Sequence, residues 1–171
     1  MGRKSTKTNK NIYQTTREAL GLTREEASEL LGFVSADRIE KIESGKATAH
    51  PDEVRVMSEK YNSPSLCNYY CSRECAIGEK YVPEIKEKEN FPQIVLEILS
   101  SLNSLEKSRN VLIDISADGE IQDHEIADLI AIQDELERIS ITVETLQLWV
   151  EKRLSSGEIN REQYERFKKE Q

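Results

Sequence analysis

The chain has 171 residues, a formal net charge of −8, 33% charged residues, three cysteines and two histidines. This length suits one domain or two small ones. No apolar run approaches the roughly 20 residues that cross a membrane, and the polar start is unlike a secretory signal, so we expect a cytoplasmic protein without membrane contact. Three cysteines argue against a disulfide framework, and few glycines, prolines and aromatic residues favour an all-α fold.

The charge is divided unevenly along the chain. Residues 1–80 carry 13 Lys and Arg against 12 Asp and Glu, whereas residues 81–171 carry 11 against 20. The acidic excess therefore belongs to the second half. Residues 1–10 predict a flexible basic arm suited to phosphates, because they contain no acid and no core-forming apolar pattern. A solvated tail without a specific role is the alternative. The cations of this arm are Arg3, Lys4, Lys7 and Lys10.

Apolar residues in the first half recur at helical spacing in short segments. They predict a domain over residues 11–77 with helices at 11–20, 23–31, 36–44 and 51–61 and a fifth from about residue 65. Thr23 and Glu26 form a capping box at the start of the second helix, and Gly32 ends it. Ser35 is placed to cap the third helix. Two short helices joined by such a tight corner are the geometry of a helix-turn-helix.

The segment from Arg17 to Lys46 contains Gly-Leu-Thr-x-Glu-Glu-Ala and Ile-x-x-Ile-Glu-x-Gly-Lys. With these motifs, residues 10–62 resemble the Cro/C1-type (lambda-repressor-like, XRE family) helix-turn-helix domain. The resemblance implies a five-helix DNA-binding domain and a structural ion pair between Arg17 and Glu43. It also implies that DNA is contacted by Arg24, Ser35, Ala36, Asp37, Arg38, Lys41, Ser44 and Lys46. Among these, we expect Arg38 and Lys41 to contact base edges or phosphates.

Acidic residues also occur on the predicted recognition helix, at Asp37 and Glu40. The phosphate field opposes acid in that place. The alternative from another functional class is therefore a protein-interaction adaptor or antitoxin-like module built on the same fold.

All three cysteines lie close together, at Cys67, Cys71 and Cys75. On a helix, their i, i+4, i+8 spacing places three sulfurs near one face. Three such thiols could hold zinc with His50 as a fourth ligand, anchor an iron–sulfur cluster, or sense redox state. They could equally be core residues, because free cysteine is among the most buried residue types.

Residues 78–90 are charged and interrupted by Pro83, which predicts a linker. Residues 91–171 predict an acidic domain built as a long-helix hairpin or coiled coil, with its second long helix over residues 123–154 and a short terminal helix over 160–169. The heptad seam of the second long helix is Leu129, Ile132, Leu136, Ile139, Val143, Leu146 and Val150. Because regulators of this type usually read two half-sites, we expect homodimerisation here. An intramolecular bundle around Ile141 and Trp149 is the alternative.

Residues 114–125, at the corner between the long helices, fit the pattern of a calcium-binding EF-hand loop. The candidate calcium ligands are Asp114, Ser116, Asp118, Glu120, Gln122 and Glu125. A loop without metal accounts for the same residues, because Gly119 can end one helix and Gln122 or Asp123 can cap the next.

The sequence contains no recognisable catalytic set, so we expect no enzymatic activity and no required cofactor. It predicts a sequence-specific transcriptional regulator, a repressor, whose partners are double-stranded DNA and a second copy of the chain. A metal- or redox-sensing regulator acting through the three cysteines is a variant of this prediction.

Overall fold

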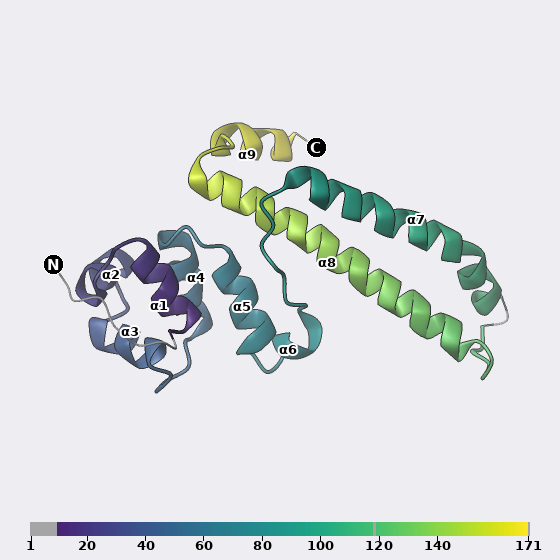
Figure 1. Ribbon diagram of the computed structural model, residues 1–171, viewed down its shortest axis with the longest axis horizontal. Coiled ribbons are helices and arrows are strands. Elements are labelled where there is room, and N and C mark those ends of the chain that lie inside the picture. The colour runs from purple at the N-terminus through teal and green to yellow at the C-terminus, as the bar shows by residue number, and fades with distance from the viewer. Residues whose placement is uncertain (1–9, 118, 171) are drawn as a thin grey trace. The chain divides into compact units, whose positions relative to one another are not determined.

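A computed structural model describes residues 10–117 and 119–170, and every regular element within these ranges is a helix (Figure 1). The predicted all-α fold is confirmed there. Contacts divide the chain into two compact units, one formed by the chain up to Glu84 together with the stretch from Val150, the other by Ile85–Trp149. The helices are α1 Ile12–Ala19, α2 Arg24–Leu31, α3 Ala36–Glu43, α4 Pro51–Lys60, α5 Ser65–Arg73, α6 Gly78–Tyr81, α7 Phe91–Ser116, α8 Ile126–Ser156 and α9 Arg161–Lys169.

Side-chain caps explain where the first three helices begin. The side chains of Asn11, Thr23 and Ser35 each accept a hydrogen bond from the backbone N–H three residues further on. Such caps satisfy amides that have no partner inside the helix. Gly32 ends α2 at a φ of 81°, in the left-handed region that glycine adopts without strain. The corner between α2 and α3 is therefore fixed by a glycine and a serine cap.

The first unit has a continuous apolar core contributed by α1 to α5 and the loops between them. Helix α5 belongs to this domain, because Leu66 is fully buried and the Tyr13 hydroxyl donates a 3.0 Å hydrogen bond to Glu74. The rings of Tyr13 and Tyr69 also meet edge to face, with centroids 6.1 Å apart. The buried core residues are Tyr13, Ala27, Leu31, Val34, Ile39, Ile42, Ala49, Val54, Met57, Tyr61 and Leu66.

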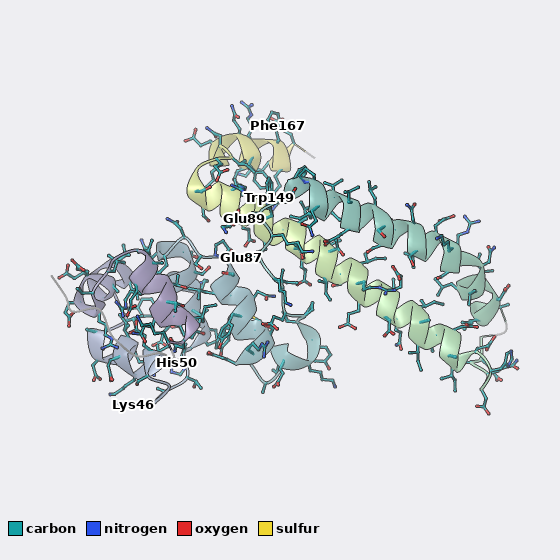
Figure 2. The ribbon with its side chains drawn as sticks, in the orientation of Figure 1. Lys46, His50, Glu87, Glu89, Trp149 and Phe167 are labelled. Carbon is teal, nitrogen blue, oxygen red and sulfur yellow. The ribbon has the colours of Figure 1, made fainter. Side chains whose placement is uncertain are left out.

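In the second unit, α7 and α8 lie side by side and run in opposite directions (Figure 1). Their open end is closed by the rings of Phe91 and Trp149, whose centroids are 4.8 Å apart. The indole N–H of Trp149 also donates to the backbone oxygen of Glu89, and Figure 2 labels both residues. The predicted long-helix hairpin is thus present, with α8 beginning at Ile126, later than predicted. No helix in the described ranges is both long and apolar enough to cross a membrane.

The predicted heptad seam of α8 is only partly buried. Ile132 is buried, but Leu136 and Val143 are exposed. The other buried residues of α8 are Glu135, Thr142, Thr145 and Leu148. Both threonine hydroxyls donate to backbone oxygens four residues earlier, which satisfies them without a partner helix. Within one chain, part of the apolar seam therefore remains uncovered.

The linker predicted over residues 78–90 begins as a helical turn, α6. Gly78 is buried against the backbone of Cys71, and a Cβ at Gly78 would lie 2.1 Å from the oxygen of Cys71. Only glycine allows this approach. The sequence did not predict this turn, because the segment is rich in charged residues. No helix is present over residues 82–90, in agreement with the predicted linker.

Candidate nucleic-acid interface

The predicted recognition helix α3 presents several of its predicted DNA-contacting residues to solvent. Ser35, Asp37, Lys41 and Lys46 are exposed, whereas Arg24, Ala36, Arg38 and Ser44 are half-buried. The Ser35 hydroxyl accepts from the N–H of Arg38, and the Ser44 hydroxyl is 3.3 Å from the oxygen of Lys41. The sequence therefore places a capped, partly exposed helix beside the corner that follows α2.

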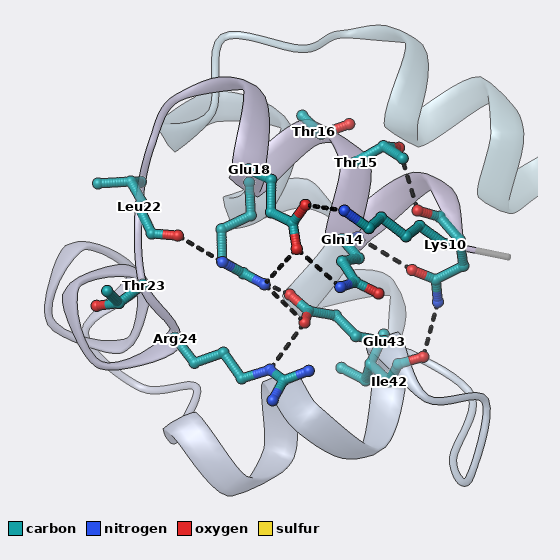
Figure 3. A network of polar contacts seen from close by, with 12 residues as sticks. Lys10, Gln14, Thr15, Thr16, Glu18, Leu22, Thr23, Arg24, Ile42 and Glu43 are labelled. Carbon is teal, nitrogen blue, oxygen red and sulfur yellow. Dashed lines mark hydrogen bonds and ion pairs between the residues drawn. The ribbon is translucent and has the colours of Figure 1, made fainter. Parts of the chain in front are cut away.

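Glu43, at the end of α3, binds two arginines (Figure 3). Arg17 donates from Nε to Oε1 at 2.6 Å and from Nη2 to Oε2 at 2.9 Å, and a further Arg17 nitrogen donates to the backbone oxygen of Leu22. The Glu43 side chain is 1% exposed. Burial and this two-pronged geometry fix α1 against α3, and the pKa of Arg17 is raised mainly by its hydrogen bond to Glu43. The pair that the resemblance implied is present.

Arg24 joins the same carboxylate, with its Nε 2.8 Å from Oε2 of Glu43. Its side chain is 35% exposed, so it borders solvent while anchored to α3. The sequence predicted a DNA contact for Arg24 and did not predict this ion pair. The bond places the guanidinium at the edge of the network in Figure 3.

The network extends along α1 through Asn11, Gln14 and Glu18, which the sequence did not single out, and through Lys10, which it assigned to the basic arm. The other cations of that predicted arm, Arg3, Lys4 and Lys7, lie outside the described residues. Lys10 Nζ lies 2.6 Å from Glu18, and the amide of Gln14 donates to the same carboxylate at 2.8 Å. These two bonds, Lys10 first, lower the pKa of Glu18. Asn11 donates to the backbone oxygen of Ile42 at 2.8 Å, which ties the start of α1 to the end of α3. The i, i+4 spacing of Gln14 and Glu18 was a local signal for part of this network.

Arg38, predicted to contact DNA, is bound to Glu53 of α4. Its Nε and Nη2 donate to the two carboxylate oxygens at 2.7 and 2.8 Å, and Nη2 also donates to the backbone oxygen of Thr48 at 2.8 Å. Burial alone would raise the pKa of Glu53, but the bonds from Arg38 and from the backbone N–H of His50 lower it. These contacts fix the loop between α3 and α4 and compete with contacts to DNA.

Lys41 and Lys46 form ion pairs that are more exposed than those of Arg24 and Arg38. Lys41 lies 2.7 Å from Asp37 one turn earlier, and Lys46 lies 3.3 Å from Glu40. Exposed ion pairs of this kind contribute about 0–1 kcal/mol, so little free energy opposes the exchange of a carboxylate for a phosphate. Figure 2 labels Lys46 in the loop that leaves α3.

The three cysteines do not share one helix. Cys67 and Cys71 belong to α5, which ends at Arg73, and Cys75 follows it. All three thiols are free and partly buried, and the N–H of Gly78 lies 3.4 Å from Sγ of Cys75. Burial raises the pKa of Cys71, and the neighbouring sulfurs of Cys75 and Cys67 raise it further. Cys67 and Cys71 are therefore one turn apart on α5, whereas Cys75 lies beyond the single helix that the sequence spacing assumed.

Two geometric findings bear on the candidate metal ligands. His50 stands at the start of α4, where its backbone N–H donates to Glu53 at 2.7 Å. Within residues 10–117 and 119–170, no three side chains of His, Cys, Asp or Glu are grouped so that they could hold a metal ion. The cysteines therefore have no preformed set of metal ligands in the described part of the chain.

At the candidate calcium loop, α7 continues through Asp114 to Ser116, and the Ser116 hydroxyl donates to the backbone oxygen of Ile113. Glu125 accepts from the N–H of Gln122 at 2.8 Å, a cap-like contact just before α8. Asp118, the central predicted ligand, lies outside the described residues. The described residues form a helix–helix connection, and calcium binding at this loop stays a prediction.

Comparison with known families finds a match over the first helices of the chain. Residues 14–64 match a family model described as a helix-turn-helix domain, which extends from α1 past the end of α4. Neither the curated proteins nor the solved structures that were searched gave a match to the chain. The match includes both helices of the motif and the corner between them. Residues 14–64 of this chain therefore resemble a helix-turn-helix domain.

Proposed function

We propose that the chain is a sequence-specific, DNA-binding transcriptional regulator of the Cro/C1 type, acting as a repressor in the cytoplasm. The observation that carries this proposal is the helix-turn-helix match over residues 14–64, which coincides with the capped helices α2 and α3. The second helix of such a motif enters the major groove. In this chain that helix is α3.

The cations of the proposed DNA surface form two groups that differ in how firmly carboxylates hold them. Lys41 and Lys46 are exposed and weakly paired, so they supply the phosphate or base contacts. Arg24 and Arg38 are tied to Glu43 and Glu53, so they position α3 and reach DNA only with their remaining N–H groups. Arginine suits this double use because it has five donors.

We also propose that the regulator is a homodimer. The exposed apolar residues Leu136 and Val143 on α8 support this, because a second chain would cover them. Two copies of α3 would then read two half-sites, and the affinity would not depend on one weakly cationic domain. The acidic second half need not face DNA for this purpose.

The test is binding of the full chain to duplex DNA as a function of salt, first with a random duplex pool and then with sequences selected from it. Neutralised phosphates make log affinity fall linearly with log salt. We expect Lys41→Ala and Lys46→Ala each to reduce the slope by about 1 if each contacts one phosphate. Lys168→Ala, which removes the same charge from α9, is the matched control and should leave the slope unchanged. A salt-independent interaction, or no binding at all, would reject the proposal.

The adaptor or antitoxin-like function is the second candidate, because acids pair with the cations on and around α3. A protein ligand for this surface would be recognised without the steep salt dependence that phosphates impose. The same titration therefore separates the two functions.

A further inference from the structure

Helix α7 leaves an unusual amount of apolar surface uncovered. Of its 26 residues, only Ile94 and Ile115 are buried. Leu99, Leu102 and Ile113 are 52%, 49% and 55% exposed. Glu106 and Arg109 continue the same alternating spacing of three and four residues, which keeps successive residues on one helical face. We name this face the α7 stripe: Leu99, Leu102, Glu106, Arg109 and Ile113.

The neighbouring helix adds apolar surface on the same side. Leu136 and Val143 of α8 are exposed, although they belong to its heptad pattern. At 3.6 residues per turn, the α7 stripe and the two exposed residues of α8 are each rotated in the same sense from the buried face of their own helix. Because the helices are antiparallel, both groups lie on one side of the hairpin. One chain therefore carries a broad apolar face with two charges near the middle of the α7 stripe.

Those two charges make the α7 stripe self-complementary. Glu106 and Arg109 lie 3.2 Å apart, and their side chains are 70% and 65% exposed. The point midway between them along the helix is also midway between Leu102 and Ile113. If a second α7 crosses antiparallel at this point, Glu106 faces the partner's Arg109 and Leu102 faces the partner's Ile113. The twofold axis repeats each contact.

We propose that the α7 stripe is the homodimer interface and that its occupant is a second copy of α7 packed antiparallel. This inference rests on the proposed homodimeric function and specifies its surface and register. The charge pattern favours a second copy, because a parallel pair in register would oppose Glu106 to the partner's Glu106. In the antiparallel pair, four charges of alternating sign are flanked by apolar contacts on both sides.

Charge exchange in the full chain tests the register. Glu106→Arg alone, or Arg109→Glu alone, places like charges opposite each other across the twofold axis, and should raise the dimer Kd about a hundredfold or more. The double variant E106R/R109E restores opposite charges in both positions, so it should recover a Kd near that of the wild type. The measurement is sedimentation over a range of concentrations, with helicity followed by circular dichroism.

Lys107→Glu is the control, because it changes the charge of α7 by the same amount as Arg109→Glu but lies off the stripe. It should leave the dimer intact. Leu102→Asn tests the apolar contact independently and should also weaken dimerisation. A wild-type monomer overturns the inference, as does a dimer that the single reversals leave unchanged or that the double variant fails to restore. Salt-dependent DNA binding, measured on the same samples, shows whether the proposed regulator function fails separately.

Discussion

Arg38 on α3 and Glu53 on α4 are joined by two parallel hydrogen bonds, Nε to Oε1 at 2.7 Å and Nη2 to Oε2 at 2.8 Å. The Glu53 side chain is 9% exposed, so the pair is largely shielded from water. This geometry gives Arg38 a structural role at the junction of α3 and α4. Its further contact with Thr48 extends that role to the intervening loop.

A double-mutant cycle over Arg38→Ala and Glu53→Ala should measure this structural role. We expect each single variant to lower the unfolding free energy by about 1–3 kcal/mol, because each leaves a charged partner with fewer hydrogen bonds. The double variant should be less destabilised than the sum of the single variants, with a coupling energy of about 1–2 kcal/mol. Urea denaturation supplies these values. Additive effects would mean that the pair contributes nothing to the junction.

Substitution of Glu43 should destabilise the fold more than substitution of Arg24, the peripheral arginine that binds it. Glu43→Gln removes the charge that compensates the buried Arg17, and breaking a buried pair from one side costs about 3–5 kcal/mol. Arg24→Ala removes a half-exposed partner and should cost about 1 kcal/mol or less. Thermal or urea unfolding of the two variants measures the contrast. Equal losses would contradict the separation of Arg17 and Arg24 into a buried and a peripheral contact.

The Glu53 contact also predicts a pH dependence. Because the pKa of Glu53 is lowered in the folded chain from its ordinary value of 4.5, the pair stabilises the fold above that value. This contribution is lost as the pH falls from about 4.5 through the folded pKa. The stability gap between wild type and Glu53→Gln should therefore be constant near pH 7 and shrink below about pH 4.5. A gap that widened on acidification would have the wrong sign for this pair.

The sequence predicted the elements that depend on local signals. Thr23, Glu26 and Ser35 are caps whose partners lie three residues away, so their positions follow from spacing alone. The start of α4 at Pro51 follows similarly from the fixed φ of proline. These signals located both helices of the motif within one or two residues.

Contacts between residues far apart in the sequence were harder to predict from the sequence. Arg38 and Glu53 are 15 residues apart, and nothing in the local pattern indicates that the loop after α3 brings them together. The Arg17–Glu43 pair was expected from the family resemblance, whereas the contribution of Arg24 to it was not. Amphipathic spacing gave the length of α8 but not which of two adjacent faces meets α7. That choice depends on the partner helix.

Gly78→Ala should loosen the turn that carries the cysteines. A Cβ at this position would lie 2.1 Å from the backbone oxygen of Cys71, and a backbone atom cannot rotate away as a side chain can. We expect α6 to separate from α5, with a loss of about 1–3 kcal/mol typical of steric overpacking. Hydrogen exchange of the Val82 N–H, which donates to the oxygen of Gly78, reports on the turn. Ala76→Gly, at an exposed neighbouring position, is the control for a change of backbone freedom.

Cys71 should react as a thiol whose deprotonation is disfavoured. Its pKa lies above the ordinary value of 9.0 because burial and then the sulfurs of Cys75 and Cys67 oppose the thiolate. Since only the thiolate is alkylated, the pH midpoint for modification by iodoacetamide should lie above 9.0 in the folded chain. Denaturation in urea should return the midpoint to the ordinary value, and Cys75→Ser should lower it part of the way in the folded chain. Peptide mass spectrometry follows Cys71 separately from the other two thiols. A midpoint below the ordinary value would instead indicate a nearby positive charge that activates the thiolate, and would contradict the packing of α5 against α6.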